Sequence, residues 1–334
     1  MMVHALNAKN YKGLDSNNNI DVLDYKARFI SNEILELLDS AGVIKETITA
    51  DKIVINTGAH AVIPDIEGID TTQKIYDSTW LLNIDYHPQE LIIIGGGYIA
   101  LEFASMFANF GTHVTILERG DIIMPREDHE VVNLVIKDLQ DKGVTINTNI
   151  HTIAFSNVEN QAIVHTNQGN YSADAVLLAT GRKPHTSDLG LENTDIKLGQ
   201  QGEVIVNKHL QTAVKYIYAA GDVKGGLQFT YISLDDYRII KSHMFGIVFR
   251  TTENRGVIPY SVFIDPPLSK VGLTASEAES KGYNFLENKI YVNIIPRHKI
   301  NNDPRGLFKA VINKETNGIL GATYMTKNLR NLLI

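Results

Sequence analysis

A glycine-rich turn between two apolar segments has the clearest chemistry in this sequence. Residues 95–100 read Gly-Gly-Gly-Tyr-Ile-Ala, a G-x-G-x-x-A pattern that follows the apolar run Leu91–Ile94. Gly95 permits a tight turn, Gly97 lets the backbone approach a pyrophosphate, and Ala100 lets a helix pack closely on a strand. The phosphates would then lie at a helix N-terminus, where unpaired N–H groups and the helix dipole favour negative charge.

A carboxylate follows this turn at the spacing that a dinucleotide site requires. Glu118 closes the next apolar run, 23 residues after Gly95, where it would accept hydrogen bonds from the ribose hydroxyls of NAD. Because a carboxylate here repels a 2′-phosphate, Glu118 favours NADH. Arg119 and Arg126 lie nearby and would pair with such a phosphate, which leaves NADPH open, although solvated loop charges are the simpler interpretation of both. A glycine turn without a ligand is the alternative for the whole pattern.

Two further apolar runs end alike. Residues 53–58 (Ile-Val-Ile-Asn-Thr-Gly) and 176–181 (Val-Leu-Leu-Ala-Thr-Gly) lie 123 residues apart and both finish in Thr-Gly. The repetition indicates two related α/β domains, with chance recurrence at strand ends as the alternative. Another short run, Tyr218–Ala220, ends in Gly221-Asp222. Taken alone, Asp222 is best explained as the cap of a following helix.

The composition narrows the chemistry further. The chain has 334 residues, no cysteine, 31 Lys and Arg, and 38 Asp and Glu, which give a formal charge of -7. Without cysteine, disulfides, Cys-ligated zinc, iron–sulfur clusters and thiol nucleophiles are excluded. The net negative charge argues against nucleic acid or an anionic membrane as the main partner. The eleven histidines are spread singly, so no helical metal pair is predicted.

The sequence favours a protein that stays in the cytoplasm. Its start lacks the basic stretch and apolar core of a signal peptide. Residues 91–110 are mostly apolar, but they include Glu102 and three consecutive glycines, so a buried strand, turn and helix fit better than a membrane span. We therefore expect a cytoplasmic location, with no membrane and no nucleic acid among the partners.

The apolar pattern predicts strands and helices that alternate around these motifs. Short apolar runs predict strands, and 3.6-residue periodicity that ends at glycine predicts helices. Predicted strands cover 53–56, 91–94, 114–117, 144–146, 175–179, 260–264, 289–295 and 307–312. Predicted helices cover part of 21–38, then 99–110, 128–142, a segment from about 232, and 274–281 with Thr274 and Glu277 as a capping box. An antiparallel meander is predicted over 151–171 and a linker over 251–256.

Together these motifs resemble those of the flavoprotein disulfide reductases, the family of glutathione reductase, lipoamide dehydrogenase and mercuric reductase. Residues 57–59, 95–102, 179–182 and 221–222 occur in that family's order and spacing. Residues 258–260 with 271–274 resemble the start of its dimerisation domain. The stretch 222–240 is most similar to the bacterial branch linked to resistance to reactive chlorine and hypothiocyanous acid. The resemblance covers nearly the whole chain.

The resemblance implies an α/β fold. It implies two Rossmann-like FAD- and NAD(P)-binding domains, the first of them incomplete, and a partial α+β dimerisation domain. The implied division assigns 1–75 and 185–255 to the FAD domain, 76–184 to the NAD(P) domain and 256–334 to the dimerisation domain. A homodimer would follow if the dimerisation domain were complete.

The resemblance also implies roles for single residues. NAD(P)H would be bound by Gly95, Gly96, Gly97, Tyr98, Ile99, Ala100, Leu101, Glu102 and Glu118, with Gly181 on the nicotinamide side. FAD would be contacted by Ala27, Thr57, Gly58, Ala59, Asp222, Gln228, Phe229 and Thr230. In this family, hydride passes from NAD(P)H to FAD and then to a disulfide or a small oxidant.

Some motifs of the resembled family have no match in this sequence. Gly95 precedes Gly181 by 86 residues, but no glycine fingerprint precedes Gly58, and the redox-active Cys-x4-Cys pair and the C-terminal His–Glu pair are not found. We therefore expect a family member cut at both ends, with no catalytic residue of its own for the disulfide step. One alternative is an inactive or complementing fragment that retains only nicotinamide dinucleotide binding. Another is an intact, cysteine-free NADH:acceptor flavoenzyme.

Overall fold

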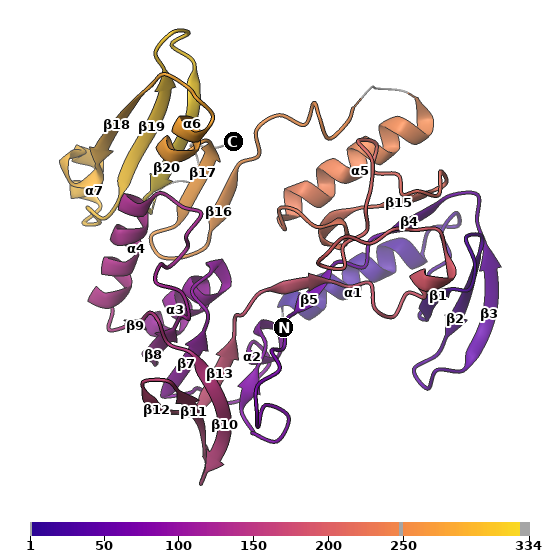
Figure 1. The fold of residues 1–334 in the computed structure, drawn as a ribbon, viewed down its shortest axis with the longest axis horizontal. Coiled ribbons are helices and arrows are strands. Elements are labelled where there is room, and N and C mark those ends of the chain that lie inside the picture. The colour runs from indigo at the N-terminus through magenta and orange to yellow at the C-terminus, as the bar shows by residue number, and fades with distance from the viewer. Residues whose placement is uncertain (1, 247–249, 328–334) are drawn as a thin grey trace. The chain divides into compact units, whose positions relative to one another are not determined.

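A computed structural model describes residues 2–246 and 250–327 of the chain (Figure 1). The described residues divide into two compact units, each built from two stretches of chain. The first unit combines Met1–Gly58 with Pro184–Thr252, and the second combines Ala59–Lys183 with Glu253–Ile334. The last passage between the units falls after Thr252, inside the polar stretch 251–256 for which the sequence predicts a linker.

A five-stranded parallel sheet forms the centre of the second unit (Figure 1). Its strands are nearly unbroken runs of branched apolar residues, as expected for strands that are covered on both faces. The four strands predicted between 91 and 179 are confirmed, and a fifth short strand was not predicted. In order across the sheet, the strands are β6 (Ile75–Tyr76), β13 (Ala175–Leu178), β7 (Glu90–Ile94), β8 (His113–Leu117) and β9 (Thr145–Asn147).

Two helices of this unit, α3 (Tyr98–Asn109) and α4 (His129–Asp141), confirm the predicted helices. Asp128 caps α4 by accepting hydrogen bonds from two backbone N–H groups of its first turn. Gly111 and Gly143 follow the helix ends with φ angles of +91° and +88°, a left-handed conformation that favours glycine. A single turn, α2 (Ser78–Leu81), precedes β7. Among the described residues, every helix is too short or too polar to cross a membrane.

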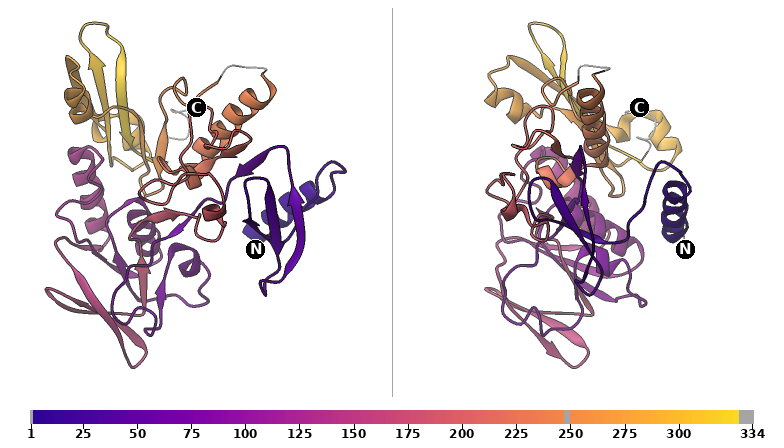
Figure 2. Two further views of the ribbon diagram at one scale, coloured as in Figure 1. Left: turned by 45° about the vertical axis from the view of Figure 1, so that its right-hand side comes forward. Right: turned by 90° about the vertical axis from the view of Figure 1, so that its right-hand side faces the viewer.

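The predicted antiparallel meander is confirmed and lies against the parallel sheet (Figure 2). It consists of β10 (Thr152–Val158), β11 (Gln161–Thr166) and β12 (Gly169–Ala173). Apolar side chains of the meander and of the sheet form one buried cluster, which includes Phe155, Val164, Ile92 and Leu117. A short pair of strands, β5 (Ala59–Ala61) and β14 (Arg182–Pro184), lies at two of the three points where the chain changes unit.

Residues 253–327 form a C-terminal subdomain around a five-stranded antiparallel sheet. Helix α6 (Ala275–Ser280) carries the predicted capping box, and α7 (Pro296–Ile300) was not predicted. The strand expected at 289–295 is misplaced: it covers Phe285–Tyr291, and the chain then turns through η3 (Val292–Ile294) because Pro296 begins α7. The sheet order is β16 (Tyr260–Val262), β17 (Leu268–Gly272), β20 (Ile319–Met325), β19 (Leu307–Asn313) and β18 (Phe285–Tyr291).

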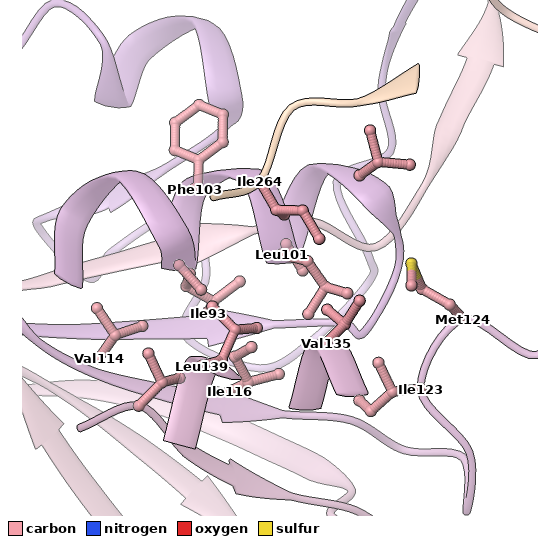
Figure 3. Close-up of a cluster of buried hydrophobic side chains, with 14 of the residues drawn as sticks. Ile93, Leu101, Phe103, Val114, Ile116, Ile123, Met124, Val135, Leu139 and Ile264 are labelled. Carbon is pink, nitrogen blue, oxygen red and sulfur yellow. The ribbon is translucent and has the colours of Figure 1, made fainter. Parts of the chain in front are cut away.

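The C-terminal subdomain and the parallel sheet share one hydrophobic core. Ile264, which follows β16, is buried in the same cluster as Leu101 and Phe103 of α3 (Figure 3). Leu268 and Met325 belong to this cluster as well, so the core continues into the antiparallel sheet. Burial of this many large side chains across the junction joins the two parts of the second unit.

The first unit contains a parallel pair of strands, β4 (Ile53–Ile55) and β15 (Ile217–Ala219), and the long helix α5 (Thr230–Phe245). The strand at 53–56 and the helix near 232 are thereby confirmed. The helical prediction within 21–38 is wrong, because Leu35 and Leu37 alternate with half-buried residues and their strand is paired on both sides. This antiparallel sheet comprises β1 (Lys26–Phe29), β2 (Ile34–Leu38) and β3 (Ile44–Thr49), and an exposed helix, α1 (Met2–Asp15), precedes it.

Candidate functional site

A cavity of about 880 Å³ opens at the carboxyl ends of β7, β8 and β13 in the second unit. The loops that follow these three strands supply most of its wall, as parallel topology dictates, because the carboxyl ends of parallel strands meet at one edge of a sheet. The lining residues include Gly95, Gly96, Gly97, Tyr98, Glu118, Arg119, Met124, Arg126, His151, Thr180 and Gly181.

The glycine turn packs tightly on one side and is open on the other. A Cβ atom on Gly95, whose φ is +114°, would lie 2.4 Å from the backbone oxygen of Ala179, so only glycine fits there. A Cβ atom on Gly97 would have no heavy atom within 4 Å. Gly97 is also the N-cap of α3 and makes no side-chain cap, so the first N–H groups of the helix face no capping oxygen. This geometry fits a pyrophosphate that approaches Gly97 and the helix N-terminus.

Glu118 lies beside the turn with a fixed carboxylate. Its Oε1 accepts a hydrogen bond of 2.6 Å from the backbone N–H of Gly120. Its Oε2 lies 3.0 Å from the position that a Cβ atom on Gly96 would occupy. The carboxylate therefore reaches the cavity wall next to the turn, as the ribose-binding role requires.

Gly181 lines the cavity at the end of β13, the strand that pairs with β7. Its φ is +116°, and its backbone oxygen accepts from the N–H of Val62 at 2.9 Å. The hydroxyl of Thr180 donates to the backbone oxygen of Val62 at 2.8 Å. These two bonds hold the Thr-Gly ending of β13 against the segment after β5, so both form one wall.

Four residues of the implied NAD(P) set do not line the cavity. Ala100 and Leu101 are fully buried in the core between α3 and the sheet, where Ala100 allows the close packing that the motif predicts. Ile99 is partly buried against the same core. The carboxylate of Glu102 accepts the backbone N–H of Phe263 at 2.8 Å, and burial raises the pKa of this carboxyl group. Glu102 thus contacts the C-terminal subdomain instead of the cavity.

The cavity also has lining residues for which the sequence offered no signal. Val62, Pro64 and His151 come from irregular segments whose position depends on the meander and on β5. Met124 comes from the loop after β8, and its backbone N–H donates a hydrogen bond of 3.1 Å to the backbone oxygen of Gly96. The sequence carries no local pattern that places this loop beside the glycine turn.

In the first unit, part of the implied FAD set meets at the ends of one parallel strand pair. Thr57 and Gly58 follow β4, and Asp222 follows β15 in a short turn, η2 (Gly221–Lys224). A Cβ atom on Gly221 would lie 2.9 Å from Oδ1 of Asn56, so the two strand endings are adjacent. The Thr57 hydroxyl donates to the backbone oxygen of His185 at 2.7 Å.

The other implied FAD residues have separate positions. Gln228 and Phe229 precede α5, which begins at Thr230 and has Phe229 as an N-cap without a side-chain cap. Its first N–H groups therefore suit an acceptor on a ligand. Ala27 lies exposed on β1 in the antiparallel sheet, and Ala59 belongs to β5 of the second unit. The strand ends and the start of α5 fit a flavin nucleotide on chemical grounds, because they offer backbone N–H donors and a carboxylate.

Comparison of this chain with known proteins shows the family to which it belongs. The family model described as "pyridine nucleotide-disulphide oxidoreductase" matches residues 3–236, and the model of its dimerisation domain matches 258–334. The chain therefore belongs to the pyridine nucleotide-disulphide oxidoreductases, which are enzymes that bind FAD and NAD(P)H. The mixed α/β fold that the sequence implied agrees with this membership.

Among its relatives, the chain is 45% identical over 324 residues to "probable pyridine nucleotide-disulfide oxidoreductase RclA" of Escherichia coli, covering 97% of this chain and 73% of that protein. It is 32% identical over 336 residues to a mercuric reductase of Staphylococcus aureus, with 99% of this chain and 60% of that protein covered. The solved structure of the HOCl-induced flavoprotein disulfide reductase RclA from E. coli matches with a TM-score of 0.92 at 45% identity, over 98% of this chain and 74% of that one.

Proposed function

We propose that this chain is an FAD-dependent NAD(P)H oxidoreductase whose second unit binds the pyridine nucleotide in the cavity described above. The observation that carries the proposal is the combination of the open face at Gly97, the uncapped start of α3 and the carboxylate of Glu118 on one cavity wall. The chemistry that the two cofactors supply is the movement of hydride from NAD(P)H to FAD and on to a disulfide or oxidant substrate.

In this proposal, residues of the chain bind the two cofactors and orient them. Backbone N–H groups at Gly97 and in the first turn of α3 would bind the pyrophosphate, and Glu118 would accept hydrogen bonds from the ribose hydroxyls. Thr57, Gly58, Asp222 and the start of α5 would hold the flavin nucleotide in the first unit. Val62, Ile66 and Ile94 supply apolar side chains to the cavity wall.

The disulfide step needs a sulfur nucleophile, and none of the 334 residues is a cysteine. This supports a second candidate, an inactive or complementing fragment that retains nicotinamide dinucleotide binding. Purification of the chain, a visible spectrum and an NADH oxidation assay separate the two. A stoichiometric flavin band with NADH oxidation supports the oxidoreductase. Colourless protein that still quenches NADH fluorescence supports the fragment, and the absence of both signals contradicts both.

We further propose NADH as the preferred nucleotide, a homodimer as the assembly and the cytoplasm as the location. The dimerisation model matches 258–334, and exposed apolar side chains such as Leu286 and Ile290 lie on β18 of that region. Light scattering on the purified chain tests the dimer, and a mass of one chain at micromolar concentration would contradict it.

A further inference from the structure

Tyr98 is the one tyrosine on the cavity wall, within the part of the chain that the structure describes, and its hydroxyl is held from behind. The hydroxyl donates a hydrogen bond of 2.6 Å to Oε1 of Glu127. Glu127 ends the loop after β8, and that loop also contributes Arg119, Met124 and Arg126 to the cavity wall. One carboxylate thus connects two neighbouring parts of the wall.

The carboxylate of Glu127 is buried, and its side chain is 1% exposed. It also accepts a hydrogen bond from the hydroxyl of Tyr260, on β16. Nζ of Lys270, on β17, lies 3.9 Å from Oε2 of Glu127 and 3.2 Å from Oε2 of Glu277. The buried negative charge is therefore surrounded by two donors and a cation, which is the condition under which such a charge is tolerated.

Both tyrosines keep their protons in this environment. Burial raises the pKa of Tyr98 and of Tyr260, and the hydrogen bond that each makes to Glu127 raises it further. The two rings lie with centroids 6.1 Å apart at an interplanar angle of 54°. The hydroxyl groups therefore act as donors throughout the physiological pH range, and the two rings form a tilted aromatic pair.

The loop after β8 has a second attachment. The backbone N–H of Met124 donates to Gly96 at 3.1 Å, and the N–H of Glu127 donates to Met124 at 3.0 Å. The loop that carries Arg119 and Arg126 is thus attached once to the glycine turn and once, through Glu127, to the first residue of α3.

We propose that Glu127, held by Tyr260 and Lys270 of the C-terminal subdomain, positions the Tyr98 ring at the wall of the nucleotide cavity. This inference rests on the proposed nucleotide binding. Tyr260 on β16 and Lys270 on β17 do not line the cavity. They would therefore be positioning residues for the nucleotide, acting through their contacts with Glu127.

The test measures the Kd of NADH and NADPH on the full chain by nucleotide fluorescence. Tyr260→Phe and Glu127→Gln are each expected to raise the Kd about fivefold, the factor that corresponds to one lost hydrogen bond. Lys270→Met removes the cation 3.9 Å from Glu127 and is expected to raise the Kd in the same direction. Lys270→Arg keeps the cation and is expected to restore most of the affinity. Tyr291→Phe is the matched control, because Tyr291 also donates from this subdomain to a carboxylate, Glu130, which does not line the cavity.

A double-mutant cycle separates positioning from simple stabilisation. If Glu127 acts through Tyr98, Glu127→Gln has little further effect on the Kd in a Tyr98→Phe background. Additive effects, or an unchanged Kd in all single variants of a parent that binds nucleotide, would overturn the inference and leave the proposed function intact. A parent that binds neither nucleotide would overturn the proposed function and the inference with it. Tyr260→Phe removes a single oxygen atom, so it carries the test should Glu127→Gln fail to fold.

Discussion

Glu118 places a negative charge on the cavity wall, and Arg119 and Arg126 place positive charges on the same wall. The carboxylate and the two arginines differ in their exposure to solvent. Glu118 is fixed by the N–H of Gly120 and touches the turn, whereas the side chains of the two arginines are exposed. A fixed carboxylate discriminates between ribose hydroxyls and a 2′-phosphate better than exposed cations do, because exposed charges are screened.

Replacement of Glu118 by alanine tests this difference. We expect Glu118→Ala to raise the Kd of NADH about tenfold, since hydrogen bonds to a charged acceptor are lost, and to change the Kd of NADPH much less. Glu90→Ala is the control, because Glu90 begins β7 at the opposite end of the strand from the cavity and pairs with His113. Fluorescence titration gives both constants, and a parent that prefers NADPH would contradict the assignment.

At the scale of elements, the first and third glycines of the turn have different surroundings. One is packed against backbone, and the other faces open space. Gly95 is required by packing, because a side chain there would collide with the backbone after β13. Gly97 has φ and ψ of −86° and −172°, which any residue adopts, and open space where a Cβ would be. Packing does not require glycine at 97, and the open space beside it fits the pyrophosphate approach that we propose.

The pair Gly95→Ala and Gly97→Ala makes this distinction measurable. We expect Gly95→Ala to lower the free energy of unfolding by about 2 kcal/mol or more, through backbone strain and overlap with Ala179. We expect Gly97→Ala to change it by about 1 kcal/mol or less, the cost of alanine at an N-cap, while raising the Kd of NADH roughly tenfold or more by blocking the pyrophosphate. Denaturant unfolding of both variants measures the free energy of unfolding, and nucleotide titration of both measures the Kd of NADH. A Gly97→Ala variant that binds normally would contradict the proposed site.

The elements that the sequence predicts well are those with a strong local pattern. The apolar runs of β7, β8 and β13 and the capped periodicity of α4 are local signals, and each element forms as expected. The segment 34–38 misled the prediction because Ile-Leu-Glu-Leu-Leu satisfies both a helical and an alternating pattern, and only pairing with β1 and β3 decides between them. The contribution of His151 or Val62 to the cavity wall depends on distant chain segments, which no local pattern reports.

At the scale of the molecule, ion pairs join the C-terminal subdomain to helix α4. The carboxylate of Glu130 accepts hydrogen bonds from Lys289 and Tyr291 and lies 3.4 Å from Nζ of Lys309. The hydrogen bond from Lys289, and next that from Tyr291, lowers the pKa of Glu130 from its ordinary value of 4.5 to about 2. The ionised carboxylate is therefore favoured in the folded protein.

This shift predicts a pH-dependent contribution to stability. A lowered pKa in the folded state stabilises the protein above the ordinary value of 4.5, and this contribution is lost as the pH falls toward about 2. We expect Glu130→Gln to lower the free energy of unfolding by roughly 0.5–1 kcal/mol at pH 7, with the difference from the parent narrowing below pH 4.5. Urea unfolding at pH 7, 5 and 3.5 measures the narrowing, with the exposed Glu315→Gln as the control. A difference that stays constant with pH would contradict the prediction.

The shared core of the second unit has a consequence for the order in which the protein is made. The parallel sheet and its glycine turn are complete by Lys183, but Ile264, Leu268 and Met325 belong to the same core as α3 and α4. Residues 184–252, which belong to the other unit, leave the ribosome in between. The parallel sheet is thus synthesised well before the side chains that complete its core, and the apolar surface of α3 is exposed in the nascent chain until they arrive.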